Sequence, residues 1–476
     1  MNNTTKTTKQ SAAALTDRRR NLIFLNIVIS CIASSLLSTA LTTALPSIME
    51  DLSISATTGQ WLTSGYSLAM GIMMPLTAFL IRRFPTRRLY IFSLVLFLAG
   101  LFLNAIAPSF PLMMAARVLQ ASGNGIMSAM AQVIILTIYP AKKRGTAMGW
   151  YGLSIGAAPV IAPTLAGLIV DSIGWRAIFY LSMIIICASL VWSILVFTDV
   201  LETSVSSFDT VSFLLSVFAF GGVTLGIGNI GSYPFLSLQV LGILAVGLIT
   251  AILFVKRQFG LETPFLELRI LKSRQYALSV IGSVFLYLVM MGSSMLMPLY
   301  IQNTMGYSAT VSGLAVLPGS LIMAMISPFA GKFYDRLGMK KLFLAGSICM
   351  FASNLGMIFI NSNMNLLPAI LLNIVRNLSV GCLLMSLVTW GNSGIETEKI
   401  ADGTALLTSL RTIAGAIGTA VFVGIMNAVS QSTSATLPAR EASMRGVNIA
   451  FLCMSAVSLI LVLIAVFGVK KEGDDR

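Results

Sequence analysis

The sequence predicts an all-α membrane protein with fourteen transmembrane helices, arranged as two six-helix bundles plus two extra central helices. Three observations predict this class. The chain of 476 residues is 56% hydrophobic and only 10% charged, and its mean hydropathy is +0.89. Its apolar residues form long runs, and its Lys and Arg residues gather in short loops between them. A soluble protein needs more polar surface than this, so many apolar side chains must face lipid.

Fourteen segments are long enough to cross a bilayer, since a helix needs about 20 apolar residues to do so. The first is too long for the apolar core of a signal peptide. The loop around residues 232–234 is so short that the seventh and eighth segments could instead form a hairpin, which would leave twelve. The segments begin near Asn21, Gln60, Leu89, Pro111, Gly145, Ala177, Thr210, Phe235, Tyr276, Ala309, Lys341, Leu366, Asp402 and Gly446.

The loops alternate between basic and nearly uncharged. The side that holds the N-terminus carries 25 of the 31 Lys and Arg residues, and the other side carries three. Cytoplasmic loops of membrane proteins hold the positive charge. We therefore predict a multi-pass protein of the plasma membrane with both termini in the cytoplasm. The remaining three arginines fall within spans: Arg117, Arg376 and Arg411.

Composition also excludes several function classes. The net charge of +14 is scattered over many loops and forms no single face, so nucleic acid is not an expected partner. The chain has no histidine and no grouping of nucleophile and base, so we expect neither an enzyme nor a metal or other cofactor. All five cysteines lie inside apolar spans, away from disulfide or metal-site spacings: Cys31, Cys187, Cys349, Cys382 and Cys453.

An internal repeat divides the chain into halves. The basic loop at 82–88 and the loop at 331–341 each follow the second span of a six-span set, and Arg117 and Arg376 each lie in a fourth span. Two six-span halves with an inserted pair are the pattern of a parallel-repeat transporter. The predicted units are a cytoplasmic tail (1–20), an N-terminal bundle (21–198), a two-helix insert (199–275), a C-terminal bundle (276–469) and a cytoplasmic tail (470–476).

The motifs resemble the major facilitator superfamily, and within it the fourteen-span drug:proton antiporters. The loop from Gly331 to Lys341 is similar to the cytoplasmic signature of that superfamily, with Asp335, Arg336 and Gly338 in place. The other matches are Arg117 to Gln120 with Gly123, the set Gly156, Pro159, Pro163 and Gly167, Ala44-Leu45-Pro46, Trp61, Tyr66, Leu317-Pro318-Gly319 and Arg411. The resemblance implies a bacterial, monomeric exporter of small amphiphilic compounds, working by alternating access and proton antiport.

Four positions depart from the family pattern. In the first cytoplasmic loop, Ala78 and Arg82 replace the usual Gly and Asp, so the latch of the N-terminal half should be altered. Leu37 stands where the branch usually has an acidic residue, and Ala121 replaces a Gly in the fourth span.

An arginine at span depth costs roughly 3 kcal/mol on insertion scales, so it should be paired or face a cavity. Arg117, beside Gln120 and Asn124, is either a gate or proton-coupling element or a buried post between helices. Arg376 and Arg411 have the same two interpretations, and for them we favour the post. Tyr287, Met291 and Met295 are candidates for a pliable pocket. The full set predicted for a substrate cavity is Gln60, Ser64, Tyr66, Arg117, Gln120, Asn124, Tyr287, Met291, Met295 and Arg411.

No Asp or Glu lies in the middle of a span, so the candidates for proton coupling are Asp402 and Asp209 at helix starts, where capping is the simpler role. Moving one charge across the membrane changes the free energy by about 2.3 kcal/mol per 100 mV. A potential that is negative inside therefore opposes export of a cation and favours export of an anion. The alternative function is therefore an uncoupled or potential-driven transporter of one anionic or neutral metabolite. The residues predicted for gating are Arg117, Pro159, Pro163, Gly167, Gly331, Asp335, Arg336 and Gly338.

Overall fold

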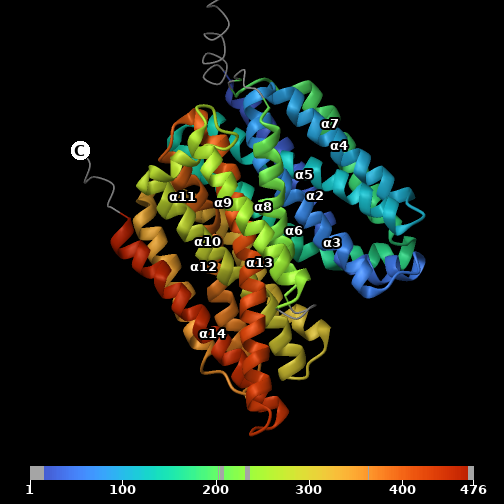
Figure 1. Ribbon diagram of the computed structural model, residues 1–476, viewed down its shortest axis with the longest axis vertical. Helices are drawn as coiled ribbons and strands as arrows, with labels where there is room; N and C mark the ends of the chain where they lie inside the picture. The colour runs from blue at the N-terminus through green and yellow to red at the C-terminus, as the bar shows by residue number, and fades with distance from the viewer. Residues whose placement is uncertain (1–14, 202, 204–207, 231–235, 363, 470–476) are drawn as a thin grey trace, which may run out of the picture.

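The computed structural model describes residues 15–201, 203, 208–230, 236–362 and 364–469. Residues 1–14 of the predicted N-terminal tail, the whole predicted C-terminal tail (470–476) and residues 231–235 lie outside the described residues. Two blocks of helices stand side by side with a helix pair between them (Figure 1). The first block comprises α2 (Asp17–Asp51), α3 (Ala56–Arg83), α4 (Thr86–Ile106), α5 (Phe110–Ile138), α6 (Ala141–Ile173) and α7 (Arg176–Val196).

The intervening pair comprises α8 (Thr210–Gly228) and α9 (Ile243–Gly260), with the short segments η1 (Leu238–Gly242) and η2 (Leu268–Lys272). The second block comprises α10 (Arg274–Leu299), η3 (Tyr300–Thr304), α11 (Ala309–Met357), α12 (Leu367–Ser393), η4 (Thr397–Lys399), α13 (Ile400–Thr433), α14 (Ala439–Leu463) and η5 (Ile464–Gly468). Twelve described segments are long and apolar enough to cross a membrane. Both α8 and the segment from η1 through α9 are among them.

Local sequence explains where these helices begin. Thr16, Ser55, Asp209, Ser273 and Ser308 each precede a helix and accept a hydrogen bond from a backbone N–H of its first turn. Short polar side chains are the preferred N-caps because they satisfy donors that the helix leaves unpaired. The apolar runs that follow supply the surface that packs.

The longest helix, α11, is two arms joined at a corner. Gly338 lies between them with φ 73° and ψ 170°, outside helical geometry. A positive φ of this size favours glycine, since other residues place their Cβ against the backbone. The corner falls inside the 331–341 loop, so the tenth and eleventh predicted spans are the two arms of α11.

The cores of the two blocks merge at one end of the molecule, which we call the terminal end because α2 begins there and η5 ends there. One buried apolar cluster lies mainly in α2–α7 but continues into Tyr276, Ile400 and Leu406 of the second block. A second cluster lies in α10–α14. The two blocks lie together at the terminal end and diverge away from it (Figure 1).

Candidate functional site

Three buried polar side chains follow one face of α5. Arg117, Gln120 and Asn124 occur at spacings of three and four residues, which places them on one side of a helix. The Nε of Arg117 donates to the carbonyl of Leu62 at 3.0 Å, and Nη1 donates to Gln120 Oε1 at 2.6 Å. The guanidinium carbon lies 4.0 Å from the centroid of the Tyr66 ring.

Asn124 extends the same group of contacts. Its Nδ2 donates to the hydroxyl of Tyr66 at 2.8 Å, and its Oδ1 accepts from the Ser128 hydroxyl at 3.2 Å. Together these contacts tie α3 to α5. They give Arg117 the partners that a buried cation requires, as expected for a post between helices. The gating role of Arg117 stays a prediction.

Arg411 of α13 lies in a different setting. It is 7% exposed, and its guanidinium carbon lies 4.7 Å from the centroid of the Tyr287 ring of α10. Its Nη1 is buried without a hydrogen-bond partner among the described residues. Met291, one turn after Tyr287 on α10, packs against Gly415, one turn after Arg411 on α13. A Cβ added to Gly415 would lie 2.9 Å from Met291 Cγ.

The third buried arginine faces the core of its own block. The Nη2 of Arg376 donates to Asn373 Oδ1, and its guanidinium carbon lies 5.6 Å from the centroid of the Phe451 ring of α14. Of the other residues predicted for the cavity, Ser64 and Met295 are exposed. The side chains of Gln60, Pro159 and Pro163 lie outside the described residues.

At the terminal end, Arg82 of α3 and Asp402 of α13 form an ion pair between the two blocks. The Arg82 Nη1 lies 2.5 Å from Asp402 Oδ2 and 2.7 Å from Oδ1. The backbone N–H of Glu267 donates to Asp402 at 3.0 Å, and Arg82 Nη2 donates to the carbonyls of Pro264 and Phe265. Asp402 is 1% exposed, and it is the only buried carboxylate in the described part of the chain.

A second contact between the blocks has the opposite polarity. Asp335 of α11 accepts from the backbone N–H groups of Gly145 and Thr146 at 2.9 and 2.7 Å, and from the Thr146 hydroxyl at 2.6 Å. Asp335 stands in its loop where Arg82 stands in the first loop. Likewise, α6 reads Arg144-Gly145-Thr146 where α13 reads Asp402-Gly403-Thr404. In the sequence the acid and the base have therefore exchanged places between the two halves. In the structure only Arg82 and Asp402 of these four residues form an ion pair, because Asp335 contacts the backbone at Gly145 and Thr146, and Arg144 donates to the Tyr139 carbonyl.

The space around the glycines of α6 and α11 shows where the two blocks are in contact. A Cβ added to Gly145, Gly149, Gly152 or Gly156 of α6 would lie within about 3.3 Å of α11 or α12 atoms. Farther along the same helices, a Cβ on Gly167 of α6 or Gly313 of α11 would meet nothing within 4 Å.

The helices α3 and α13, which also join the blocks at the terminal end, have open space farther along as well. Gly71 of α3 and Gly424 of α13 also have open space at the Cβ position. At about 100° per residue, Gly71 lies on the face of Arg82 and Gly424 near the face of Asp402. The blocks are thus closed at the terminal end and separated at the opposite end.

The remaining predicted gating residues lie near the terminal end, around the corner of α11. Gly331 packs against Gly145, since an added Cβ would lie 2.1 Å from the Gly145 carbonyl oxygen. Arg336 is exposed, and Gly338 forms the corner.

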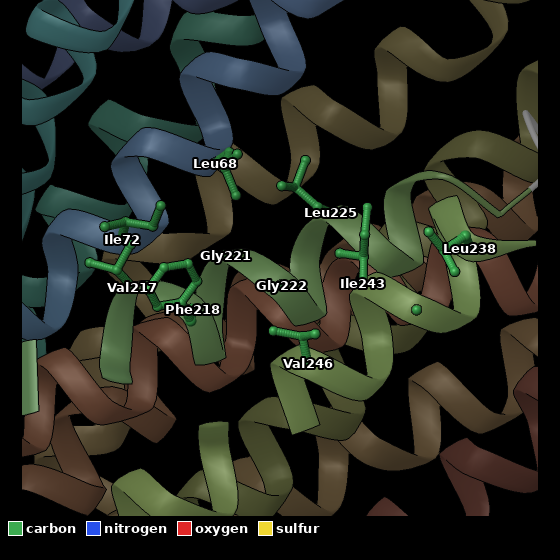
Figure 2. A pocket seen from close by; sticks show the side chains of 11 residues that line it. Leu68, Ile72, Val217, Phe218, Gly221, Gly222, Leu225, Leu238, Ile243 and Val246 are labelled. Carbon is green, nitrogen blue, oxygen red and sulfur yellow. The ribbon is translucent and has the colours of Figure 1, made fainter. Parts of the chain in front are cut away.

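A cavity of about 580 Å³ lies between α3, α8 and α9 (Figure 2). Apolar side chains such as Leu68, Ile72 and Phe218 line it, together with Gly221, Gly222 and Gly242. It contains no side chain that could recognise a charged group, so the polar candidates lie elsewhere.

Asp209, the second candidate for proton coupling, caps α8. Its Oδ1 accepts from the N–H groups of Val211 and Ser212, and Arg257 pairs with it at 3.0 Å. Burial acts to raise the pKa of Asp209, but the hydrogen bonds from Arg257 and Ser212 outweigh it and lower the pKa to about 2. Asp209 therefore stays charged near neutral pH, which suits the capping role.

Comparison with known proteins identifies the family. The model of the Major Facilitator Superfamily matches residues 23–419. The chain belongs to this superfamily. It is 34% identical over 459 residues to the lincomycin resistance protein LmrB of Bacillus subtilis, covering 94% of this chain and 95% of LmrB. It is 36% identical over 434 residues to the MFS-type transporter YcnB of the same organism, covering 91% of each.

A more distant sequence relative and a solved structure of similar fold extend the comparison. The multidrug export protein EmrB of Haemophilus influenzae is 29% identical over 391 residues, covering 81% of this chain and 76% of EmrB. The solved structure of the proton:xylose symporter XylE superposes with a TM-score of 0.64 at 14% identity, covering 96% and 97% of the two chains. The predictions of a major facilitator fold and of a membrane transporter are confirmed.

Sequence reasoning missed the pairing of Arg82 with Asp402. It noted Arg82 as a departure and Asp402 as a candidate, but it did not connect them. The signal was present: the repeats align Arg82 with Asp335 and Asp402 with Arg144, so a sign change at one position is matched by a sign change at the other.

Proposed function

We propose that this superfamily member exports small amphiphilic compounds across the plasma membrane by alternating access, in exchange for protons. The observation that carries the proposal is the Arg82–Asp402 ion pair, which joins the two blocks at the terminal end while their opposite ends are apart. A contact that exists only while one end is closed can stabilise that state selectively. The names of LmrB and EmrB support drug-like substrates.

The orientation and the helix count also belong to this proposal. The basic loops place the terminal end in the cytoplasm, so the state described here faces outward. The proposed count of fourteen crossings takes α6 as one crossing and the two arms of α11 as two. The boundaries of the five units predicted from the repeat, two tails, two bundles and an insert, belong to the same proposal.

Asp402 is the proposed proton carrier. A carboxylate couples transport to protons if its environment changes between the two access states. In the outward-facing state Asp402 is buried against Arg82, and opening the terminal end would separate the pair and expose it. Protonation removes the charge that attracts Arg82 and so favours opening. In this proposal the proton reaches Asp402 from the outer side in the outward-facing state and leaves to the cytoplasm once the terminal end has opened, which returns the transporter for the next substrate.

Two observations favour the alternative function, transport of an anionic or neutral metabolite without proton coupling. Leu37 is 1% exposed where the related exporters usually have an acid, and Arg411 has no carboxylate partner among the described residues. If Asp402 serves only to hold the blocks together, no other described buried acid could couple protons.

Proton flux in liposomes distinguishes these functions. The purified protein is reconstituted with a pH-sensitive dye inside and the membrane potential clamped, and the cation rhodamine 123 and the anion fluorescein are added in separate experiments. We expect substrate-dependent proton movement that Asp402→Asn reduces by about tenfold or more, because the variant carries no titratable group there. Substrate transport without proton movement in the unmodified protein would contradict antiport and leave the alternative.

Asp209→Asn is the matched control. The pKa of Asp209 is lowered, so the stabilisation from its Arg257 pair is complete above its ordinary value of 3.8 and is lost only as the pH falls towards about 2. Between about pH 6 and 8 it does not titrate, and Asp209→Asn should keep the proton flux within about twofold. Equal losses in the two variants would contradict the assignment to Asp402.

A further inference from the structure

One buried face of α13 has polar atoms without partners. Thr404 Oγ1, Thr408 Oγ1 and Arg411 Nη1 are each buried and make no hydrogen bond within the described part of the chain. Their spacings of four and three residues place all three on one face of the helix. The neighbouring Thr412 shows the usual alternative, since its hydroxyl donates to the carbonyl of Thr408 at 2.9 Å.

Unpartnered buried donors are costly and uncommon, so a cluster of them requires an explanation. Of these three side chains, Arg411 has the greatest cost of burial, because it is charged and only 7% exposed. No described carboxylate compensates it, because Asp402, the only buried one, is held by Arg82.

The surroundings of Arg411 are aromatic and come from both blocks. Tyr287 of α10 lies under the guanidinium, and Tyr151 of α6 is near enough to interact with its charge. A guanidinium stacked on a tyrosine ring, with hydroxyls one and two turns away, suits an aromatic molecule that carries an anionic acceptor group.

We propose that Thr404, Thr408 and Arg411, beside Tyr287, form the binding site for the carboxylate or phenolate group of an amphiphilic organic anion. This inference rests on the proposed transport function and specifies its substrate class. Arg411 supplies the charge-assisted hydrogen bond, the threonine hydroxyls donate to the same group, and Tyr287 packs on the apolar body. Arg117 and Arg376 lie outside this face of α13. Arg117 donates to Gln120 and the Leu62 carbonyl, and Arg376 of α12 donates to Asn373, although its Nη1 is also buried without a partner among the described residues.

Two dyes of one ring system test the site directly by equilibrium binding to the purified full chain in nanodiscs. Fluorescein is anionic at neutral pH, and rhodamine 123 is a cation. We expect Arg411→Gln to weaken fluorescein binding by about tenfold or more while rhodamine 123 changes by less than about threefold. Arg411→Lys should retain part of the fluorescein affinity.

Two further variants separate recognition from folding. Thr408→Val removes one hydroxyl and keeps the shape, and it should weaken fluorescein alone. Arg376→Gln removes a buried arginine outside the site and should leave the ratio of the two dissociation constants unchanged. The proposal is overturned if the unmodified protein does not bind fluorescein, or if Arg411→Gln weakens both dyes equally.

Binding needs neither transport nor protons, so the two proposals fail separately. Selective loss of fluorescein binding in a protein that moves no substrate in liposomes would sustain this site and contradict the transport function. If the protein transports the dyes and its preference between them is unchanged in Arg411→Gln, that result would sustain the transport function and contradict this site.

Discussion

Reversing one charge of the Arg82–Asp402 pair is expected to abolish transport and destabilise the protein, and reversing both is expected to recover much of each. Arg82→Asp places two acids together, and Asp402→Arg places two bases together. Asp402 is 1% exposed, and leaving one member of a buried pair uncompensated typically costs about 3–5 kcal/mol. The double variant recreates the polarity of the other half, where the acid belongs to the loop and the base to the helix start.

The measurement is a double-mutant cycle on the free energy of unfolding and on the transport rate. Recovery should be partial, because an Asp at position 82 cannot donate to the carbonyls of Pro264 and Phe265. The control is the exposed pair of Arg176 and Asp51, whose reversal should cost less than about 1 kcal/mol. A double variant no better than either single variant would show that charge pairing is not what the two positions provide.

Gly331→Ala is expected to have the second large effect, a loss of transport with a shift towards an open terminal end. The added Cβ would lie 2.1 Å from the carbonyl oxygen of Gly145, a backbone atom of α6 that cannot move without its helix. The methyl group therefore acts as a wedge between α6 and α11. Overpacking of this kind typically costs about 1–3 kcal/mol.

Gly313→Ala is the matched control on the same helix. Gly313 lies about five turns from Gly331 on the same face, and its Cβ position is open. Alanine in an open helical position should stabilise the helix by up to about 1 kcal/mol. The two identical substitutions should thus change the melting temperature in opposite directions. Similar transport and similar melting temperatures in both variants would contradict the contact between the blocks.

Much of the fold could be predicted from the sequence because lipid imposes a simple rule on it. Every span must satisfy its backbone internally and present apolar side chains outward, so long apolar runs are helices. The repeat of the 82–88 and 331–341 loops then indicated two related halves. The loop motif at 331–341 predicted a break between two spans. In the structure one long helix, α11, runs through this region, and the break is the corner at Gly338.

The candidate site was harder to predict because its contacts join residues that are far apart in the chain. Arg82 and Asp402 are 320 residues apart, and no local periodicity relates them. Arg117 and Arg411 look alike in sequence, each a cation within a span. Their partners distinguish them: Arg117 has Gln120 and the Leu62 carbonyl, whereas Arg411 has the ring of Tyr287 and an unpaired Nη1. Only tertiary packing determines that difference.

Distances between spin labels at the two ends test alternating access most directly. One pair, Gly167→Cys with Gly313→Cys, reports the opposite end, and another, Lys142→Cys with Arg336→Cys, reports the terminal end at exposed positions. The five native cysteines are replaced first. We predict that Asp402→Asn shortens the first distance and lengthens the second, since weakening the latch favours the inward-facing state. Two distances that change in the same direction, or that both stay unchanged, would contradict the account.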